Sequence, residues 1–288
     1  MLRIMTFNAN GIRSAADKGF WKWFHGQNAD ILCVQELKAQ EQDLQAAVRD
    51  QQGYRSWLHC AQKKGYSGVG VWSRIEPENV VIGFGSPEFD AEGRYVRLDF
   101  KGLSVISVYF PSGTSGDDRQ EAKYRFLSAF EAHVTELRKT GREIAFCGDV
   151  NIAHKEIDIK NWRGNLKHTG FLPEERAWLT HCFDELGWCD VFRRLDPRPD
   201  QYTWWSQRGQ ARAKNVGWRI DYEIATPALA ATARATSICR DEKFSDHAPL
   251  TVDYDWPEGV RRCGLRIFCS PRGSVRAMSA VERSLSDG

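Results

Sequence analysis

The chain has 288 residues, a length that one large domain or two modest ones would fill. Hydrophobic residues make up 42%, charged residues 27%, and mean hydropathy is −0.51, without an apolar run approaching the roughly 20 residues that a membrane span needs. We therefore expect a soluble protein outside membranes. Forty Lys and Arg against 38 Asp and Glu give a net charge of +2, which excludes a polybasic tail-type binder but not a nucleic-acid enzyme with an acidic centre.

The eight cysteines form no CxxC pair and have no histidine at zinc-finger spacing, which argues against a redox motif or a structural zinc site. Such unpatterned cysteines suit a reducing compartment. Residues 1–11 reach Asn and Gly too early for the apolar region of a signal peptide. We expect a cytoplasmic location.

Short apolar runs bounded by Gly, Pro, Asn or Asp recur along the chain and predict β-strands. They lie at residues 2–7, 29–35, 68–72, 80–84, 94–100, 103–111, 143–149, 218–225 and 249–254. Helical patterns occupy residues 41–50, 117–141 and 173–188. In the second of these, Asp117 or Asp118 can cap the start, and Tyr124, Leu127 and Leu137 share one face.

This mixture has more strands than a doubly wound sheet needs. It favours an α/β (α+β) fold, a four-layered sandwich in which two mixed β-sheets pack face to face with helices on the outside. We expect a catalytic domain over residues 1–256 and a C-terminal extension over residues 257–288. The last 28 residues hold six arginines against Glu282 and Asp287, with weak periodicity, which predicts a flexible appendage.

Four carboxylates follow or begin strand-like runs: Glu36, Asp149, Asp221 and Asp246. Because strand ends can present side chains at a common edge, these residues could converge with His247. Several carboxylates beside one histidine would repel one another unless a hard cation such as Mg²⁺ bound among their oxygens. Such a centre suits phosphoryl chemistry, in which a metal polarises phosphate and a separate carboxylate activates water. Taken singly, a carboxylate at the end of a strand is more often a solvated residue or a helix cap.

Seven local sequences, in chain order, carry a resemblance to one family. They are TFNANGIRS (6–14), VQELK (34–38), YFPSG (109–113), CGDVNIAHKEIDI (147–159), GFLPEER (170–176), NVGWRIDY (215–222) and SDHAPL (245–250). These blocks resemble the exonuclease III and apurinic/apyrimidinic (AP) endonuclease family, within the endonuclease/exonuclease/phosphatase superfamily. GDVN with SDH alone would indicate only the superfamily, whereas CGDVNIAHKEIDI and NVGWRIDY are more specific.

The resemblance implies a metal site that binds Mg²⁺, with Mn²⁺ able to substitute. Glu36 would be the principal ligand, with Asn8 orienting it and Asp246 near the metal or its waters. The residues implied at or near the ion are Asn8, Glu36, Asp149, Asn151, Asp246 and His247.

The resemblance also implies catalytic roles for Tyr109, Asp149, Asn151, Asp221 and His247. Asp149 would activate the attacking water, and Asn151 would orient that water or bind the scissile phosphate. Tyr109 would contact the phosphate, and His247, oriented by Asp221, would bind a phosphate oxygen. His247 held by Asp221 could instead serve as the base. We favour Asp149, because a histidine bound to phosphate is engaged as a donor.

Aromatic and basic residues acquire a use through the same resemblance. Trp204, Trp218 and Ile220 would line a small apolar pocket that accepts a flipped-out sugar lacking its base. The residues alone favour a plainer interpretation, in which these tryptophans are core aromatics.

The resemblance further places Arg163, Lys167, His168 and the loop at residues 208–214 on DNA phosphates or in a groove, although isolated cations usually belong to a solvated surface. Asn10, counted among the substrate-binding residues, stands where some members carry Asp, which points to the bacterial branch. Ser112 stands where many members have Asn, so a longer amide is replaced by a hydroxyl.

We therefore expect a Mg²⁺-dependent DNA repair nuclease that cuts 5′ to abasic sites and processes 3′ ends as an exonuclease, phosphatase or phosphodiesterase in base excision repair. Its partner would be double-stranded DNA with abasic sites or 3′ blocking groups, and the enzyme would be a monomer. One alternative is a phosphatase acting on a lipid or inositol head group. Another is a DNA-binding homologue that has lost catalysis.

Overall fold

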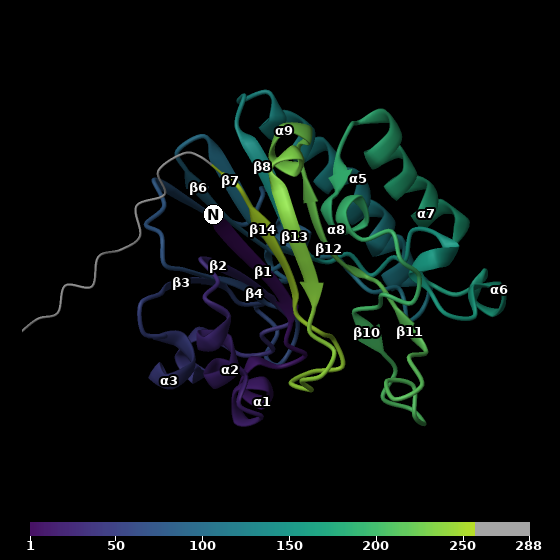
Figure 1. Ribbon diagram of the computed structural model, residues 1–288, viewed down its shortest axis with the longest axis horizontal. Helices are drawn as coiled ribbons and strands as arrows, with labels where there is room; N and C mark the ends of the chain where they lie inside the picture. The colour runs from purple at the N-terminus through teal and green to yellow at the C-terminus, as the bar shows by residue number, and fades with distance from the viewer. Residues whose placement is uncertain (257–288) are drawn as a thin grey trace, which may run out of the picture.

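Two six-stranded β-sheets packed face to face form the centre of the molecule, as the computed structural model of residues 1–256 shows (Figure 1). The first sheet has the order β13 (Ala233–Ile238), β14 (Leu250–Tyr254), β1 (Leu2–Asn8), β2 (Ile31–Gln35), β4 (Val69–Ser73), β3 (Arg55–His59). Within it, β1 and β2 run parallel and the other neighbours antiparallel. The expected extension over residues 257–288 lies outside the described residues.

The second sheet is also mixed. Its order is β5 (Asn79–Ile82), β6 (Tyr95–Phe100), β7 (Leu103–Tyr109), β8 (Glu143–Asp149), β12 (Asp221–Ala225), β9 (Cys189–Asp190). Here β7 and β8 are parallel and the other pairs antiparallel. A separate two-stranded ribbon joins β10 (Trp204–Trp205) to β11 (Gly217–Trp218).

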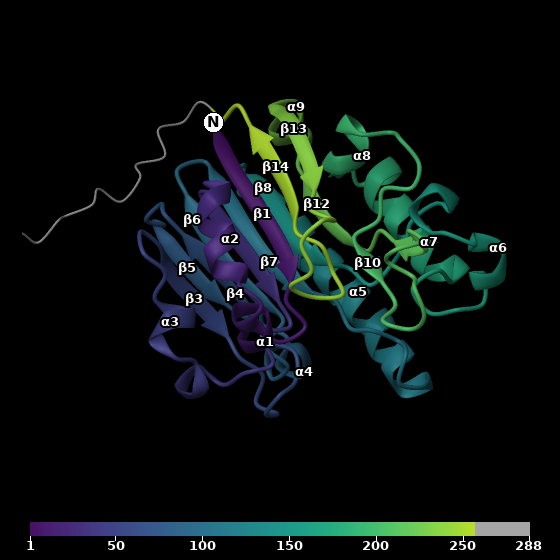
Figure 2. The same cartoon turned by 60° about the horizontal axis from the view of Figure 1, so that its bottom comes forward.

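Helices surround the two sheets, most of them on the outer faces, whereas α8 and α9 pack against the core between the sheets. They are α1 (Ile12–Asp17), α2 (Phe20–Gln27), α3 (Ala46–Arg49), α4 (Pro87–Asp90), α5 (Asp117–Arg138), α6 (Trp162–Asn165), α7 (Pro173–Thr180), α8 (Val191–Leu195) and α9 (Pro227–Ala231). Short 3-10 turns occupy Glu41–Asp43 and Glu156–Asp158, and a π turn spans His181–Glu185. Figure 2 shows α1, α2 and α3 on one side of the sandwich and α5 and α7 on the other. No helix among residues 1–256 is long and apolar enough to span a membrane.

The apolar core has three layers, which follow from the alternation of side chains along each strand. In β1, Leu2 and Ile4 face the space between the sheets, whereas Met5 and Phe7 pack against α1, α2 and α3. On the far side, α5 packs Phe126 and Phe130 onto the second sheet. The four-layered sandwich predicted from the sequence is therefore correct.

Several local expectations were wrong in detail. The N-cap of α5 is Gly116 and makes no side-chain cap, while Asp117 and Asp118 lie in the first turn, where carboxylates still face the positive end of the helix dipole. Residues 41–50 form a 3-10 turn and α3 rather than one helix. The helix predicted at 173–188 is present, as α7 followed directly by the π-helical segment His181–Glu185. The sequence patterns also missed β3 and β13, because edge strands bury only part of their side chains and lack a strong apolar signal.

Candidate active site

The candidate catalytic residues meet where strands of both sheets end. In the first sheet, β1 ends at Asn8, and Glu36 follows the last residue of the parallel strand β2. In the second sheet, Tyr109 and Asp149 are the last residues of the parallel pair β7 and β8. Asp221 begins β12 directly opposite Asp149. The convergence inferred from the sequence is thus present, and it needs both sheets.

Glu36, Asp149 and His247 form the centre of this site. Each offers a ligand atom, and these atoms lie within 4.8 Å of one another. Asn8 links the two carboxylates, because its Nδ2 donates to Glu36 Oε1 and to Asp149 Oδ2, both at 2.8 Å. Its Oδ1 accepts the backbone N–H of Asn10, which holds the Asn8 side chain between the two carboxylates. The predicted role of Asn8 in orienting Glu36 toward a metal is compatible with these contacts and stays a prediction.

Lys38, which the sequence patterns did not indicate, balances part of this negative charge. Its Nζ lies 2.7 Å from Glu36 Oε2 and donates to Asn10 Oδ1 at 2.5 Å. Burial opposes ionisation of Glu36, but the charge and hydrogen bond of Lys38 outweigh it and lower the pKa of Glu36 below its ordinary value. Glu36 itself has a φ of 52°, which turns its side chain into the site just past β2.

His247 is held by Asp221, whose Oδ2 accepts from His247 Nδ1 at 2.8 Å. Its Nε2 lies 3.9 Å from Asp149 Oδ2. Burial of the ring opposes its protonation, but the charge and hydrogen bond of Asp221, followed by the charge of Asp149, raise the pKa of His247 to about 10. The ring is therefore an imidazolium at neutral pH, with Nε2–H directed toward the centre of the site.

The side chain of Asp149 is buried in the lining of the site and accepts hydrogen bonds from Asn151. The backbone N–H of Asn151 donates to Asp149 Oδ1 at 2.8 Å, and Asn151 Nδ2 donates to Oδ2 at 3.2 Å. Burial, together with the negative charges of Asp221 and Glu36, outweighs the attraction of His247 and raises the pKa of Asp149 to about 7. A carboxyl with this pKa can take up and release a proton near neutral pH.

The donor set of the site fits a hard divalent cation. Glu36 and Asp149 supply carboxylate oxygens in a confined, negatively charged space, and oxygen ligands are those that Mg²⁺ prefers. Asp246 lies nearby, tied to Asn10 Nδ2 at 2.8 Å and to Trp204 Nε1 at 3.2 Å. Glu36 and Asp149 would hold the cation, with Asp246 within reach of its waters.

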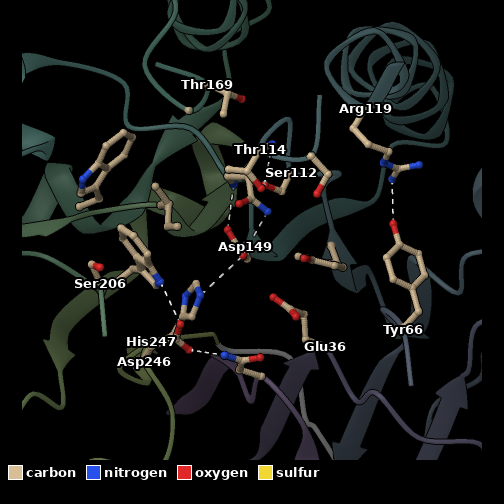
Figure 3. Close-up of a pocket in the computed structure, with 18 of the residues that line it drawn as sticks. Glu36, Tyr66, Ser112, Thr114, Arg119, Asp149, Thr169, Ser206, Asp246 and His247 are labelled. Carbon is tan, nitrogen blue, oxygen red and sulfur yellow. Dashed lines mark hydrogen bonds and ion pairs between the residues drawn. The ribbon is translucent and has the colours of Figure 1, made fainter. Parts of the chain in front are cut away.

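A single cleft of about 1090 Å³ contains this centre and extends along the surface to both sides. Figure 3 shows Glu36, Asp149 and His247 around one space, with Tyr66 and Arg119 farther along. On the opposite wall, the rings of Trp204 and Trp218 meet edge to face with centroids 6.1 Å apart. Both tryptophans are only half-buried, and with Ile220 they form an apolar wall facing the cleft. They are therefore more than core aromatics.

Residues 5–247 match the model of the endonuclease/exonuclease/phosphatase family. This chain belongs to that family. It is similar to the exodeoxyribonuclease of Bacillus subtilis (strain 168), with 37% identity over 253 residues that cover 87% of this chain and 98% of the relative. It is also similar to the DNA repair nuclease APEX1 of Danio rerio, 37% identical over 256 residues, covering 87% of this chain and 81% of the relative. The solved AP endonuclease of Archaeoglobus fulgidus shares the fold with a TM-score of 0.81 and 30% identity, covering 89% of this chain and 100% of that one.

The predicted DNA-contacting cations divide into two groups. His168 and Arg208 line the cleft, whereas Arg163 and Lys167 are exposed on α6 and the turn after it, outside the cleft lining. Arg163 instead places its guanidinium 4.5 Å from the ring centroid of Trp162. The roles of all four on DNA stay predictions.

Arg212, within the loop at residues 208–214, makes contacts inside the protein. Its guanidinium donates to the backbone oxygens of Ser245, Arg240 and Glu242 and lies over the ring of Trp205, whereas the contact of the loop with DNA stays a prediction. Arg212 therefore braces the segment that carries Asp246 and His247. The number of cations in a loop does not predict this contact of Arg212, because its acceptors are backbone oxygens far along the chain.

Four further residues at the far end of the cleft escaped the sequence analysis. Arg94 and Arg119 both donate to the hydroxyl of Tyr66, at 2.9 and 2.8 Å, and both pair with Glu92. Arg94 also lies 4.8 Å from the ring centroid of Tyr109. Burial, then the charges of Glu36 and Asp149, raise the pKa of Tyr109 well above its usual range, so Tyr109 remains a neutral phenol.

Ser112, the serine at the position where many members have Asn, also lines the cleft. Its hydroxyl lies 3.0 Å from Thr114 Oγ1, so the two neighbouring hydroxyls form a hydrogen bond. The catalytic and metal-binding roles assigned above stay predictions that the geometry makes possible.

Proposed function

We propose that this protein is a Mg²⁺-dependent DNA repair nuclease that hydrolyses the phosphodiester 5′ to an abasic site. It would also process 3′ ends as an exonuclease, phosphatase or phosphodiesterase in base excision repair. One observation carries the proposal: the Glu36, Asp149 and His247 centre and the apolar wall of Trp204 and Trp218 line the same cleft. The relatives named as a DNA repair nuclease and an AP endonuclease support it.

Asp149 is the base that we assign to the attacking water. With a pKa of about 7 it accepts a proton at neutral pH, whereas His247, with a pKa of about 10, already carries its proton and cannot. His247 Nε2–H instead donates to an oxygen of the scissile phosphate, while Asp221 holds the ring from the other side. The geometry of the two buried acids around one imidazole supports this division of roles.

When bound at Glu36 and Asp149, a divalent cation supplies charge that polarises the phosphate and stabilises the leaving 3′ oxygen. Asn151, whose side chain lies beside Asp149 at the cleft surface, would orient the water or hold a phosphate oxygen. Tyr109, a neutral phenol, can donate a hydrogen bond to the phosphate as negative charge develops.

The apolar wall explains why an abasic site would be preferred. A deoxyribose without a base is small and can leave the helix at little stacking cost, and it fits against Trp204, Trp218 and Ile220. We propose that this wall excludes, by size, a sugar that still carries its base. We infer that the substrate is double-stranded DNA with abasic sites or blocked 3′ ends and that the enzyme acts as a monomer in the bacterial cytoplasm.

The decisive experiment uses a duplex with one abasic analogue. With Mg²⁺ we expect a single nick that leaves a 3′-hydroxyl, and with EDTA no nick. Absence of a metal-dependent nick would overturn the proposal.

Variants of the loop between β10 and β11 can distinguish a DNA nuclease from a phosphatase that acts on small esters. Deleting the loop would remove Arg212 and its backbone contacts, so the sharper variant is Arg208→Ala with Lys214→Ala, both exposed cations. We expect DNA cleavage to fall while hydrolysis of a small phosphodiester is unchanged. An equal fall on both substrates would show that the loop does not contact DNA.

A further inference from the structure

A buried ion pair lies directly behind the cleft. Lys123 on α5 and Glu175 on α7 are both fully buried, and Lys123 Nζ is 2.6 Å from Glu175 Oε1. Neither side chain lines the cleft. The sequence held a signal for Lys123, because it occupies a position on the apolar face of α5, between Ala122 and Phe126.

Lys123 reaches past Glu175 to the turn that carries Asn151. Its Nζ donates to the backbone oxygen of Asn151 at 2.8 Å. Asn151 has a φ of 56°, a conformation that a non-glycine residue keeps only when its surroundings hold it. The same turn places its backbone N–H on Asp149 Oδ1 and its side-chain amide on the backbone oxygen of Phe110. Lys123 therefore stabilises the Asn151 turn through its backbone oxygen, and the backbone N–H of the same turn binds the proposed base, Asp149.

Glu175 holds the neighbouring loop. Its Oε2 accepts the backbone N–H groups of Gly170 at 2.6 Å and Leu172 at 3.0 Å, and its Oε1 accepts from Gln120 Nε2 at 3.0 Å. The loop is pressed against the apolar wall, because a Cβ built on Gly170 would lie 3.1 Å from Trp218 Cζ3. One ion pair thus joins the turn beside the base to the loop beside the sugar pocket.

Stability alone is a weak reason for such a pair. Removing two charges from water is unfavourable, and apolar side chains of similar shape often stabilise a core as well or better. What an apolar pair could not supply is the set of hydrogen bonds to three backbone groups, those of Asn151, Gly170 and Leu172.

We propose that Lys123 and Glu175 are positioning residues that fix the Asn151 turn and the loop at residues 169–172 in one relative placement. This placement aligns the Asp149 carboxylate with the wall at Trp218 that receives the sugar. The inference rests on the proposed function for its substrate, but the alignment of the Asp149 turn applies to any phosphodiester that the site hydrolyses.

The main variant is Lys123→Met combined with Glu175→Gln. It leaves no unpaired charge in the core, and the amide oxygen introduced by Glu175→Gln can still accept from the loop amides, so the protein should fold. Because Lys123 touches no substrate, we expect kcat for abasic incision to fall by about tenfold to a hundredfold with a much smaller change in KM. We also expect a lower ratio of abasic incision to 3′-end hydrolysis.

Two comparison variants make the test specific. Lys123→Arg keeps a buried cationic donor near the Asn151 oxygen and should restore most of kcat. Arg3→Met breaks another ion pair, between Arg3 Nε and Asp253 Oδ1 at 2.6 Å, which contacts neither loop. It should lower Tm and leave kcat and the substrate ratio unchanged.

A lower Tm with unchanged kcat and unchanged substrate ratio in the main variant would overturn the positioning role, as would failure of Lys123→Arg to restore kcat. All variants are also assayed with bis(p-nitrophenyl) phosphate. If the wild type hydrolyses this ester but does not nick the abasic duplex, the proposed function fails, and kcat on the ester alone then decides the positioning role.

Discussion

The net effect of burial and neighbouring charge is to raise the pKa values of both Asp149 and His247, which leaves the two groups in different protonation states. The carboxyl loses solvent and gains two acidic neighbours, which raises its pKa to about 7. The imidazole gains three acidic neighbours, which more than offset its burial and raise its pKa to about 10. The acid is thereby suited to accept a proton and the imidazolium to donate a hydrogen bond.

These values predict the pH profile of hydrolysis. A base must be deprotonated, so kcat should rise as pH passes about 7 and fall only as pH approaches about 10, where His247 loses its proton. More Mg²⁺ should move the rising limb to lower pH, because the cation favours the carboxylate. Steady-state rates across this pH range are the check. If His247 were the base, the rate would instead rise near pH 10.

Asp149→Asn is the companion variant. It removes the proposed base while keeping a side chain of similar shape, so DNA binding should be largely retained and hydrolysis should fall by orders of magnitude. Single-turnover cleavage and a binding titration with the same duplex measure the two effects. Unchanged turnover would refute the assignment of the base.

Gly170 is a second residue whose identity matters. Its φ is +88°, and an added Cβ would lie 3.1 Å from both the Asn151 oxygen and Trp218 Cζ3. Gly170→Ala should therefore push the turn and the tryptophan, lowering kcat/KM for abasic incision by about tenfold and 3′-end hydrolysis by less. Gly164→Ala is the matched control, because a Cβ there meets nothing within 4 Å. Equal losses on both substrates would contradict a role in the sugar pocket.

At the scale of elements, a second buried ion network holds the segment that carries the apolar wall residues Trp218 and Ile220. Arg219, between Trp218 and Ile220, donates to Asp158 Oδ1 at 2.7 Å and to Asp190 Oδ2 at 2.6 Å. Burial opposes ionisation of Asp158, but Arg219 and Arg193 outweigh it and lower its pKa to about 2. The segment between β11 and β12, the 3-10 turn at Glu156–Asp158 and β9 are thus held together by this network.

Asp158→Asn should destabilise the protein by about 3 kcal/mol at neutral pH, because Arg219 keeps its charge in the core with one partner fewer. The folded-state pKa of about 2 lies below the ordinary 3.8, so this stability is present above about pH 4 and lost as pH falls through about 2. Urea unfolding should show the difference from wild type shrinking over that range. A difference independent of pH would contradict the linkage.

Asp255→Asn is the control for that measurement. Its carboxylate pairs with Arg234 at 3.3 Å on the surface, with both side chains 60% exposed. The change in unfolding free energy should be within about 0.5 kcal/mol.

At the scale of the whole molecule, the site exists only because two sheets place their strand ends together. Asn8 and Glu36 come from the first sheet, and Asp149 and Asp221 come from the second. A cation held between Glu36 and Asp149 would therefore join the sheets. Binding that occurs only in the folded state must raise its stability.

Mg²⁺ should accordingly raise Tm, with a stabilisation of about 3 kcal/mol at a hundredfold excess over Kd. Glu36→Gln removes one anionic ligand and should abolish most of the rise. Thermal unfolding with Mg²⁺, and with a sodium salt at equal ionic strength, makes the comparison. An equal rise in the variant would show that the cation binds elsewhere.

The sequence by itself determined the strands with alternating or wholly apolar side chains, the four layers, and the residues proposed for the catalytic centre. These depend on local properties: side-chain alternation along a strand, turn residues at its end, and short motifs at characteristic spacing. Glu36, Asp149 and Asp221 could be found because Glu36 directly follows such a strand, Asp149 ends one and Asp221 begins one.

Only the tertiary structure decided which charged residues serve which neighbour. Arg212 braces backbone oxygens instead of facing solvent, Arg163 and Lys167 lie outside the cleft, and Lys123 reaches the Asn151 turn from behind. The partners of Arg212 and Lys123 are far away in the chain, and several are backbone atoms that are alike in every sequence. Their pairing depends on how the sheets and helices pack, which no local pattern records.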